Sequence, residues 1–372
     1  MYSLPTILLT NIRSLRYKVD ELSAVINENN IDICCVTESW LDADIPSEAV
    51  DIDDYVIHRR DRNDGRQGGG VAVYVRSDLS CVRVTENEVQ SQPLETLWLL
   101  FRSKRMPRSL SHLLLGIIYH PPDAASRPMV DHILDTIESV TKRHPSAGIM
   151  ILGDFNHMYD SSLREYPLKQ IIASATRQTA ILDKIYTNIS DWYLPPNILP
   201  ITAGSDHRTI LVVPVGGNVK RGHEITVTVR SIDLNGKNLL AHSLNNINWS
   251  PLYHMTSVET MTEYFYSTVT SLLDKHLPER IVTKHTSNKP WVTETFCRLV
   301  RQRQYAYTHG DMAKYRILRN QVNRLSIKLR QRFCEKRMRN LRRCNAANWW
   351  RETKRLTGQS TKSDLSGLAN AE

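Results

Sequence analysis

The chain has 372 residues, enough for one large domain with appendages or for two to three smaller ones. Hydrophobic residues make up 41% and charged residues 23%, an ordinary globular mixture that excludes a fully disordered or fibrous protein. Every apolar run falls short of the roughly 18 residues that a membrane-spanning helix needs, so we expect no membrane partner.

The net charge of +9 is divided unevenly along the chain. Residues 281–356 include 20 Lys and Arg but 4 Asp and Glu, a net of +16, whereas the rest holds 28 basic and 35 acidic residues, a net of −7. The basic segment favours contact with nucleic-acid phosphates, and the acidic remainder can hold metal.

Cysteine usage indicates an intracellular protein. None of the six cysteines forms a C-x-x-C pair, which argues against a zinc knuckle or ribbon. Cys34 and Cys35 are adjacent inside an apolar run and the others are scattered. We therefore expect reduced thiols.

Short apolar runs alternate with amphipathic stretches over the first 217 residues. Strands are predicted at 6–10, 31–37, 55–60, 71–75, 95–101, 113–119, 148–152, 184–188 and 209–215, and helices at 13–29 and 129–142. Because strands outnumber helices, we expect two packed β-sheets flanked by helices, a four-layer α/β sandwich, and not an alternating barrel.

Two glycines at 216–217 mark the end of this domain. The segment 218–288 is expected to connect this domain to the basic segment, and it contains a predicted strand at 224–229 and two helical stretches, the second at 258–277. The tail 357–372 is small and polar, and we expect it to be disordered.

Residues 289–356 predict a basic helical hairpin, with helices at 293–308 and 312–341. On the second helix, apolar residues recur at spacings of three and four: Tyr315, Leu318, Val322, Leu325, Leu329 and Phe333. This pattern is typical of a hairpin with one apolar seam and a cationic outside. An ordinary solvated amphipathic helix would give the same pattern.

The strongest local signal for chemistry is an apolar strand that runs into Gly153, Asp154, Phe155 and Asn156. In extended geometry Asp154 and Asn156 face the same side, where a carboxylate and a carboxamide can position a water and a phosphoryl oxygen. A simple turn is the alternative, since Gly, Asp and Asn are turn formers.

A second signal, Ser205-Asp206-His207, lies just before the last predicted strand. Ser205 lacks the G-x-S-x-G elbow of a serine nucleophile, so a hydrolytic triad is disfavoured. Polar residues also stand at other predicted strand ends or interrupt an apolar run: Asn11, Glu38, Tyr119 and Asp183. Together these groups suit Mg²⁺-assisted cleavage of a phosphodiester.

The order of these motifs resembles the endonuclease/exonuclease/phosphatase superfamily, and more narrowly the apurinic-type endonuclease domain of non-LTR retrotransposons. The motifs are NIRSL at 11–15, TESWL at 37–41, GGGV at 68–71, IYHPP at 118–122, LGDFN at 152–156, ILDKIYTN at 181–188 and SDH at 205–207. Residues 289–358 are similar to the linker that follows this endonuclease in such polyproteins. A polymerase motif is absent from the sequence, so the resemblance implies no polymerase activity.

The resemblance implies roles for individual residues. Glu38, Asn11 and Asp206 would bind Mg²⁺, with Mn²⁺ as an alternative ion. Asp154 and Asn156 would act on the attacking water, Tyr119 would donate to the scissile phosphate, and His207, oriented by Asp183, would stabilise the developing charge. The residues expected to contact DNA are Ser205, Thr176 and Arg13.

Two positions depart from the wider superfamily. Arg13 stands where repair endonucleases place a second acid, and His120 stands where an Arg usually follows the tyrosine.

We therefore expect a Mg²⁺-dependent phosphodiesterase that nicks DNA and supplies a 3′-hydroxyl for target-primed reverse transcription. The alternatives are a catalytically inactive nucleic-acid-binding remnant and a phosphomonoester or lipid-headgroup hydrolase. DNA is the expected partner, with RNA or a reverse transcriptase domain as further partners of the basic helices. A DNA substrate implies a nuclear location.

Overall fold

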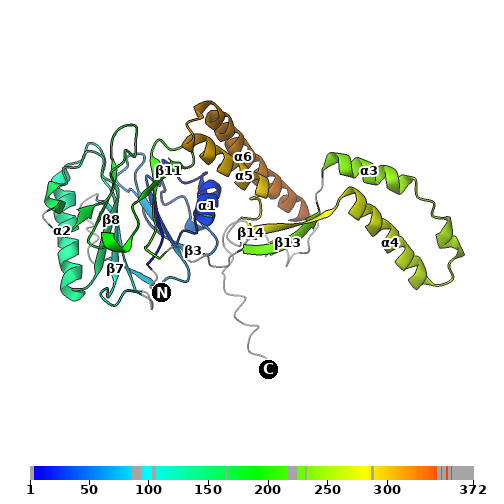
Figure 1. Ribbon diagram of the computed structural model, residues 1–372, viewed down its shortest axis with the longest axis horizontal. Coiled ribbons are helices and arrows are strands. Elements are labelled where there is room, and N and C mark those ends of the chain that lie inside the picture. The colour runs from blue at the N-terminus through cyan, green and yellow to red at the C-terminus, as the bar shows by residue number, and fades with distance from the viewer. Residues whose placement is uncertain are drawn as a thin grey trace, which may run out of the picture. The chain divides into compact units, whose positions relative to one another are not determined.

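The structure is a computed structural model that describes residues 4–85, 94–102, 106–164, 166–216, 224–230, 233–285 and 289–341, together with 345, 349, 350 and 353. The chain forms two compact units, one of residues up to Arg221 and from Ser287 onward, the other of Gly222–Thr286 (Figure 1). The tail 357–372, predicted to be disordered, lies outside the described residues. None of the helices in the described part of the chain combines the length and the apolar character needed to span a bilayer.

Two six-stranded sheets form the body of the first unit, counted over the described residues. The first has the order β11 (Asn197–Ile201), β12 (Arg208–Val212), β1 (Ile7–Asn11), β2 (Ile33–Thr37), β4 (Val71–Arg76), β3 (Tyr55–Arg60). The second has the order β5 (Cys81–Arg83), β6 (Glu95–Phe101), β7 (Leu113–Tyr119), β8 (Gly148–Asp154), β10 (Asp183–Thr187), β9 (Lys169–Gln170).

Each sheet contains one parallel pair of strands joined by a helix. β1 and β2 are parallel and are connected through α1 (Val19–Glu28), while β7 and β8 are parallel and are connected through α2 (Ser126–Arg143). A helical crossover is the usual connection between parallel strands. The carboxyl ends of each pair therefore lie at the same edge of their sheet.

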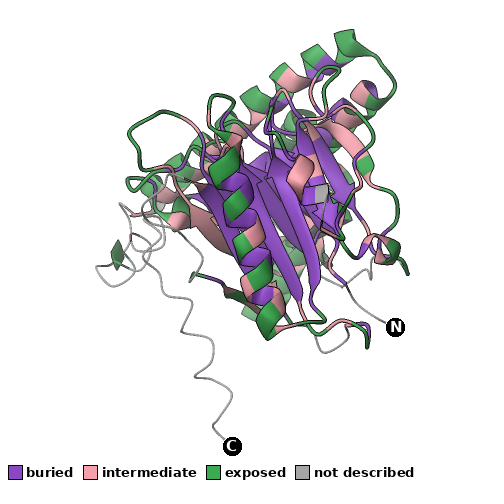
Figure 2. Cartoon of the chain, turned by 90° about the vertical axis from the view of Figure 1, so that its left-hand side faces the viewer, coloured by how far each residue is buried: buried purple, intermediate pink, exposed green. Residues whose placement is uncertain are grey.

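Three hydrophobic cores separate the layers, because alternate residues of a buried strand face opposite sides. Leu9 of β1 and Ile117 of β7 belong to the core between the sheets. Leu8 packs toward α1, and Ile118 packs toward α2. Figure 2 shows buried strands between helices whose outer faces are exposed. The predicted four-layer α/β sandwich is confirmed.

The basic segment forms α5 (Glu294–Thr308) and α6 (Met312–Leu341), within one residue of the predicted helices. Phe296 and Val300 of α5 and Val322 of α6 are buried in the same core as α1. The apolar seam is therefore covered by the body of this unit.

The second unit pairs β13 (Glu224–Arg230) with β14 (Glu279–His285) in an antiparallel ribbon. Between these strands lie α3 (Leu234–Asn245) and α4 (Val258–His276). Asp233 and Ser257 cap the two helices by accepting backbone N–H bonds. β14 was not predicted, because it has only two apolar residues, Ile281 and Val282, with charged residues on both sides of them.

The remaining differences from the prediction are local. The first helix begins at Val19 and not at residue 13, because Arg13 and Ser14 have positive φ angles of 51° and 81°. Strands β5 and β9 were too short to be recognised, and β11 contains Pro200, which argues against a strand. Single-turn helices also occur at Ser47–Val50, Ser161–Arg164, Ser190–Trp192 and Ser250–His254.

Candidate active site

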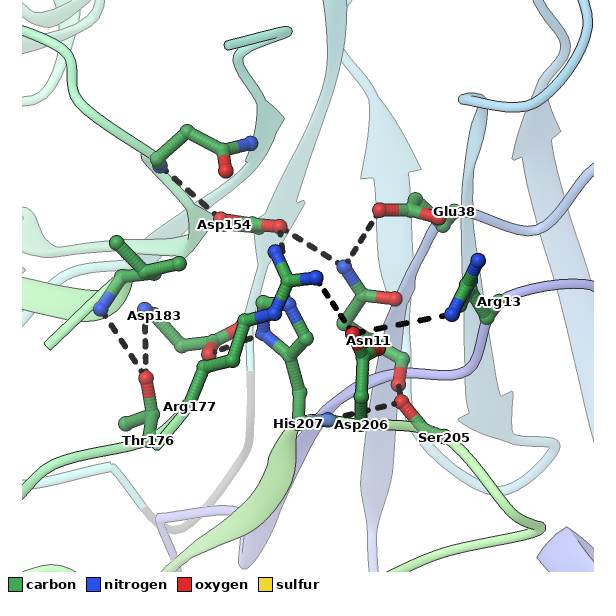
Figure 3. Close-up of polar contacts among 12 residues, drawn as sticks. Asn11, Arg13, Glu38, Asp154, Thr176, Arg177, Asp183, Ser205, Asp206 and His207 are labelled. Atoms are coloured by element: carbon green, nitrogen blue, oxygen red, sulfur yellow. Dashed lines mark hydrogen bonds and ion pairs between the residues drawn. The ribbon is translucent and has the colours of Figure 1, made fainter. Parts of the chain in front are cut away.

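Polar residues from both sheets meet where the parallel strands end (Figure 3). Asn11 is the last residue of β1, and Glu38 directly follows β2. Tyr119 and Asp154 are the last residues of β7 and β8 and are paired in register. Asp183, the first residue of β10, is paired with Asp154. Strand ends thus bring together residues that are far apart in sequence, as predicted.

The amide of Asn11 connects the two acids. Its Nδ2 atom donates to Glu38 Oε1 at 3.0 Å and to Asp154 Oδ2 at 2.8 Å. Asn11 is fully buried, and in the described part of the chain its Oδ1 atom has no hydrogen-bond partner. A buried acceptor without a partner is costly and calls for an explanation such as an ion.

Asp154 is placed by a close approach of β7 and β8. Gly153 has a φ of +152°, and a Cβ atom there would lie 1.8 Å from the carbonyl oxygen of Ile118. Glycine is therefore required immediately before Asp154. Burial and the charge of Asp183 raise the pKa of Asp154 to about 7, although His207 acts in the opposite direction.

Asn156 differs from the expectation of extended geometry. Its φ is +44°, and its backbone N–H donates to Asp154 Oδ1 at 3.0 Å, so the chain turns directly after β8. Its side-chain Nδ2 donates to the carbonyl oxygen of His120 at 2.8 Å. The motif is thus a turn as well as a site, and Asn156 holds the His120 loop against Asp154.

His207 and Asp183 form a buried pair. Nδ1 of His207 lies 2.7 Å from Asp183 Oδ2, and Nε2 lies 4.0 Å from Asp154 Oδ2. Burial lowers the pKa of His207, but the hydrogen bond and charge of Asp183, together with the charges of Asp154 and Asp206, outweigh it, so the pKa is raised above its ordinary value. The imidazole is therefore held with one nitrogen on Asp183 and the other toward Asp154.

Thr176 and Ser205 are buried, and this placement argues against the predicted contact with DNA. Thr176 Oγ1 accepts the backbone N–H of Asp183 at 3.0 Å. Ser205 Oγ donates to the carbonyl oxygen of Asn11 at 2.5 Å and accepts the N–H of His207 at 3.1 Å. Both hydroxyls are therefore engaged inside the fold, where they hold the backbone of Asp183 and of His207.

Asp206, predicted as a metal ligand, is paired with two arginines in this structure. Its carboxylate lies 2.6 Å from Arg177 Nη2 and 3.8 Å from Arg13 Nη1. Burial raises the pKa of Asp206, but Arg177 and other neighbouring cations lower it further, and the net shift is downward. Asp206 therefore positions two partly exposed arginines at the rim of the site.

Glu38 is held by a strained loop that the glycine run at 68–70 supports. Glu38 has a φ of +52°, and the following Ser39 and Trp40 donate backbone N–H bonds to Gly70 and Gly69 at 3.1 Å and 2.9 Å. A Cβ atom at Gly70 would lie 2.7 Å from Ser39 Oγ. Positive φ at a non-glycine residue is often found at functional sites.

Tyr119 is buried close to the acids. Burial and the charges of Glu38 and Asp154 raise its pKa, so the phenol keeps its proton and can donate it in a hydrogen bond. The guanidinium of Arg62 lies 5.7 Å from its ring centre and 2.5 Å from Glu95. Sequence reasoning missed Arg62, Glu95 and Arg177, since charged loop residues are common and nothing in their spacing marks them.

The residues fit a hard divalent cation. Carboxylate and amide oxygens are the ligands that Mg²⁺ prefers, and Glu38 with the unpartnered Oδ1 of Asn11 offers both side by side. Asp154, Asp183 and His207 form another group, whose ligand atoms all lie within 4.8 Å of one another. His207 and Asp183 Oδ2 are already paired with each other, although the buried Oδ1 of Asp183 has no hydrogen-bond partner in the described part of the chain. We favour Glu38 and Asn11 as ligands, because neither of their oxygens is engaged with an imidazole.

Solved structures that resemble the chain have low sequence identity to it. They include the endonuclease domain of TRAS1, a telomere-specific non-LTR retrotransposon, at 11% identity and a TM-score of 0.44, covering 56% of this chain and 96% of that one. An AP endonuclease from Archaeoglobus fulgidus gives 13% and 0.41, covering 57% and 100%. The 3′-5′ exonuclease from Neisseria meningitidis gives 14% and 0.44, covering 56% and 99%. No curated protein sequence matches the chain.

A family model matches the part of the chain that forms the sandwich. It is that of the endonuclease/exonuclease/phosphatase family, and it matches residues 8–207, more than half of the chain. All the predicted catalytic and metal-binding residues lie inside the match. The chain therefore belongs to the endonuclease/exonuclease/phosphatase family, whose fold indicates a hydrolase acting on phosphodiester bonds.

Proposed function

We propose that the chain is a Mg²⁺-dependent endonuclease that nicks one strand of DNA. The observation that carries the proposal is the amide of Asn11, which joins Glu38 and Asp154 beside the His207–Asp183 pair. The order of the sequence motifs supports the retrotransposon type of endonuclease, which would leave a 3′-hydroxyl for target-primed reverse transcription.

The side chains divide the work of hydrolysis between the two sides of the phosphate. Asp154, with its raised pKa, orients the attacking water and accepts its proton. Tyr119 donates a hydrogen bond to a phosphoryl oxygen, and His207 stabilises the negative charge that develops in the transition state. Asp183 keeps the imidazole oriented through its 2.7 Å bond to Nδ1.

A cation held by Glu38 and Asn11 would supply positive charge against the phosphate. Mn²⁺ has similar ligand preferences and is the alternative ion. The rim arginines Arg13 and Arg177, 54% and 40% exposed, are placed to contact DNA phosphates.

The basic face of α6 is the second element of the proposal. Five exposed cations follow one another at spacings of four and three: Arg324, Lys328, Arg332, Lys336 and Arg339. They form a stripe about 22 Å long at the usual helical rise. Such a stripe fits a nucleic-acid backbone, DNA or RNA, and it remains open on the outside of the hairpin.

Nicking of supercoiled plasmid tests the proposal. The full chain should convert it to open circles with Mg²⁺ and not with a chelator. Glu38→Gln should lose about 10²–10³ in rate, the usual loss for one preorganised group, whereas Glu48→Gln, at an exposed position, should behave like the parent.

Binding without cleavage would contradict the proposal. If the chain shifts DNA in a salt-dependent manner but neither Mg²⁺ nor Mn²⁺ allows nicking, it is an inactive nucleic-acid-binding remnant. Release of phosphate from a monoester without DNA nicking would instead indicate a phosphatase.

A further inference from the structure

Two acids at the start of α1 are buried, which is rare for carboxylates unless they are paired. Asp20 is 2% exposed and Glu21 is 6% exposed. Asp20 Oδ2 accepts from Trp291 Nε1 at 2.9 Å and from Arg330 Nη2 at 2.8 Å. The partners of these acids come from the basic hairpin, so the hairpin is part of what makes α1 stable.

Glu21 has one partner on the hairpin and another beside the active site. Its Oε1 atom lies 2.5 Å from Nη2 of Arg303, which is fully buried on α5. The same oxygen accepts the backbone N–H of Ala203. In the described part of the chain Nε and Nη1 of Arg303 have no hydrogen-bond partner, so the contact with Glu21 is what compensates this buried charge.

Ala203 begins the loop that carries His207. It has a φ of +53°, a conformation that an alanine keeps only when its surroundings hold it. Two residues later, Ser205 bonds to the carbonyl of Asn11 and to the N–H of His207. A shift at Ala203 would therefore move the imidazole relative to Asp154.

α5 makes a second contact at the other end of this loop. The hydroxyl of Tyr307 accepts from Nε of Arg208 at 3.3 Å, and Arg208 directly follows His207. The backbone N–H of Arg208 donates to Thr176 at 2.7 Å. Tyr307 is itself packed edge to face on Tyr315 of α6, with ring centres 5.3 Å apart.

We infer that Arg303 and Tyr307 of α5 are positioning residues for the catalytic His207 loop. Arg303 acts through Glu21 and Ala203, and Tyr307 acts through Arg208. The hairpin is then part of the catalytic unit and not merely a linker. The inference rests on the proposed function, since a 1 Å misplacement of a catalytic group can cost about 10² in rate.

Two matched double variants isolate the contact at Ala203. The first is Arg303→Met/Glu21→Gln, and the second is Arg303→Met/Glu21→Met. Both remove the buried charges and preserve side-chain size, but only glutamine keeps an acceptor for the Ala203 N–H. We expect similar melting temperatures, a kcat about tenfold lower for the Met/Met variant, and a similar KM. Arg303→Lys, which preserves the charge, should retain most of the parent kcat.

Tyr307→Phe tests the second contact. Loss of one hydrogen bond should lower kcat by about 3- to 10-fold, with KM and melting temperature unchanged. Tyr305→Phe on the same helix is the control, because Tyr305 is 63% exposed and its ring is retained.

Hydrogen exchange of the metal-free chain gives a readout that does not depend on cleavage. The amides of Ala203 and His207 should exchange faster in the Met/Met variant than in the Met/Gln variant, while those of β1 and β8 stay protected. Faster exchange together with an inactive parent would support the positioning role and contradict the proposed function. If the parent is active but the two matched variants have equal amide exchange rates and equal kcat values, the positioning inference is overturned. The proposed function would still stand in that case.

Discussion

The side-chain amide of Asn11 donates a 2.8 Å hydrogen bond to the carboxylate of Asp154, although the two residues are 143 positions apart and belong to different sheets. The same nitrogen donates to Glu38. One amide thus fixes the distance between the proposed cation ligand and the proposed base. The active site depends on how the two sheets are stacked.

Asn11→Ala should therefore reduce nicking by about 10²–10³. The change removes the bond to Asp154 and the Oδ1 ligand together, and it leaves two carboxylates without the donor between them. Plasmid-nicking kinetics at saturating Mg²⁺ measure the effect. Asn197→Ala, at an exposed position of β11, is the matched control, and equal rates for both variants would contradict the role of Asn11.

Asp183→Asn should lower the pKa of His207 in the metal-free chain. The parent pKa lies above the ordinary value of about 6.5. Burial lowers it, and Asp183 is the largest of the three acids that raise it, ahead of Asp154 and Asp206. The stability gained from the protonated pair is fully present below the ordinary pKa and is lost as the pH rises through the folded pKa. NMR titration of the imidazole measures the shift, and an unchanged pKa would show that Asp183 does not hold the charge.

Asp160 gives a prediction about stability at acid pH. Burial raises its pKa, but bonds from Lys184 and from the Tyr186 hydroxyl at 2.6 Å lower it further, and the net shift is downward. A depressed carboxyl pKa contributes stability above its unfolded value of about 4, and this contribution is lost as the pH falls through the folded pKa. Asp160→Asn should cost about 1–3 kcal/mol at pH 7 and less at pH 3.

Urea unfolding at the two pH values measures this difference. An equal loss of stability at pH 7 and pH 3 would mean that packing, and not the charge of Asp160, is what the substitution removes.

The sequence was sufficient to predict the strands that lead to Asn11, Glu38, Tyr119 and Asp154, because each is an apolar run that stops at or just before a polar residue. It was also sufficient for the two basic helices, since Val322 and its neighbours recur at helical spacing. Local patterns of this kind determine which elements form and which face is buried.

Contacts between distant segments could not be predicted in the same way. The sequence around Asp206 gives no sign of Arg177, and that around Glu21 gives no sign of Arg303, because each partner comes from another part of the fold. The hydroxyls of Ser205 and Thr176 looked available for DNA but are buried. Which polar groups remain exposed is decided by packing and not by local sequence.

The cationic stripe of α6 should contribute affinity without contributing to the chemical step. Replacing Arg324, Lys328 and Arg332 with glutamine should weaken DNA binding and reduce the slope of log K against log salt by about 0.9 for each lost phosphate contact. The rate at saturating DNA should not change, because none of these side chains belongs to the site that hydrolyses the phosphodiester. The control variant replaces Arg127, Lys142 and Arg143 of α2 with glutamine. It removes the same number of positive charges from a helix that packs on the other sheet. Equal losses of affinity in both triple variants would show that net charge alone attracts the DNA, whereas a loss confined to the α6 variant would place nucleic acid along the hairpin whose α5 we infer to position His207.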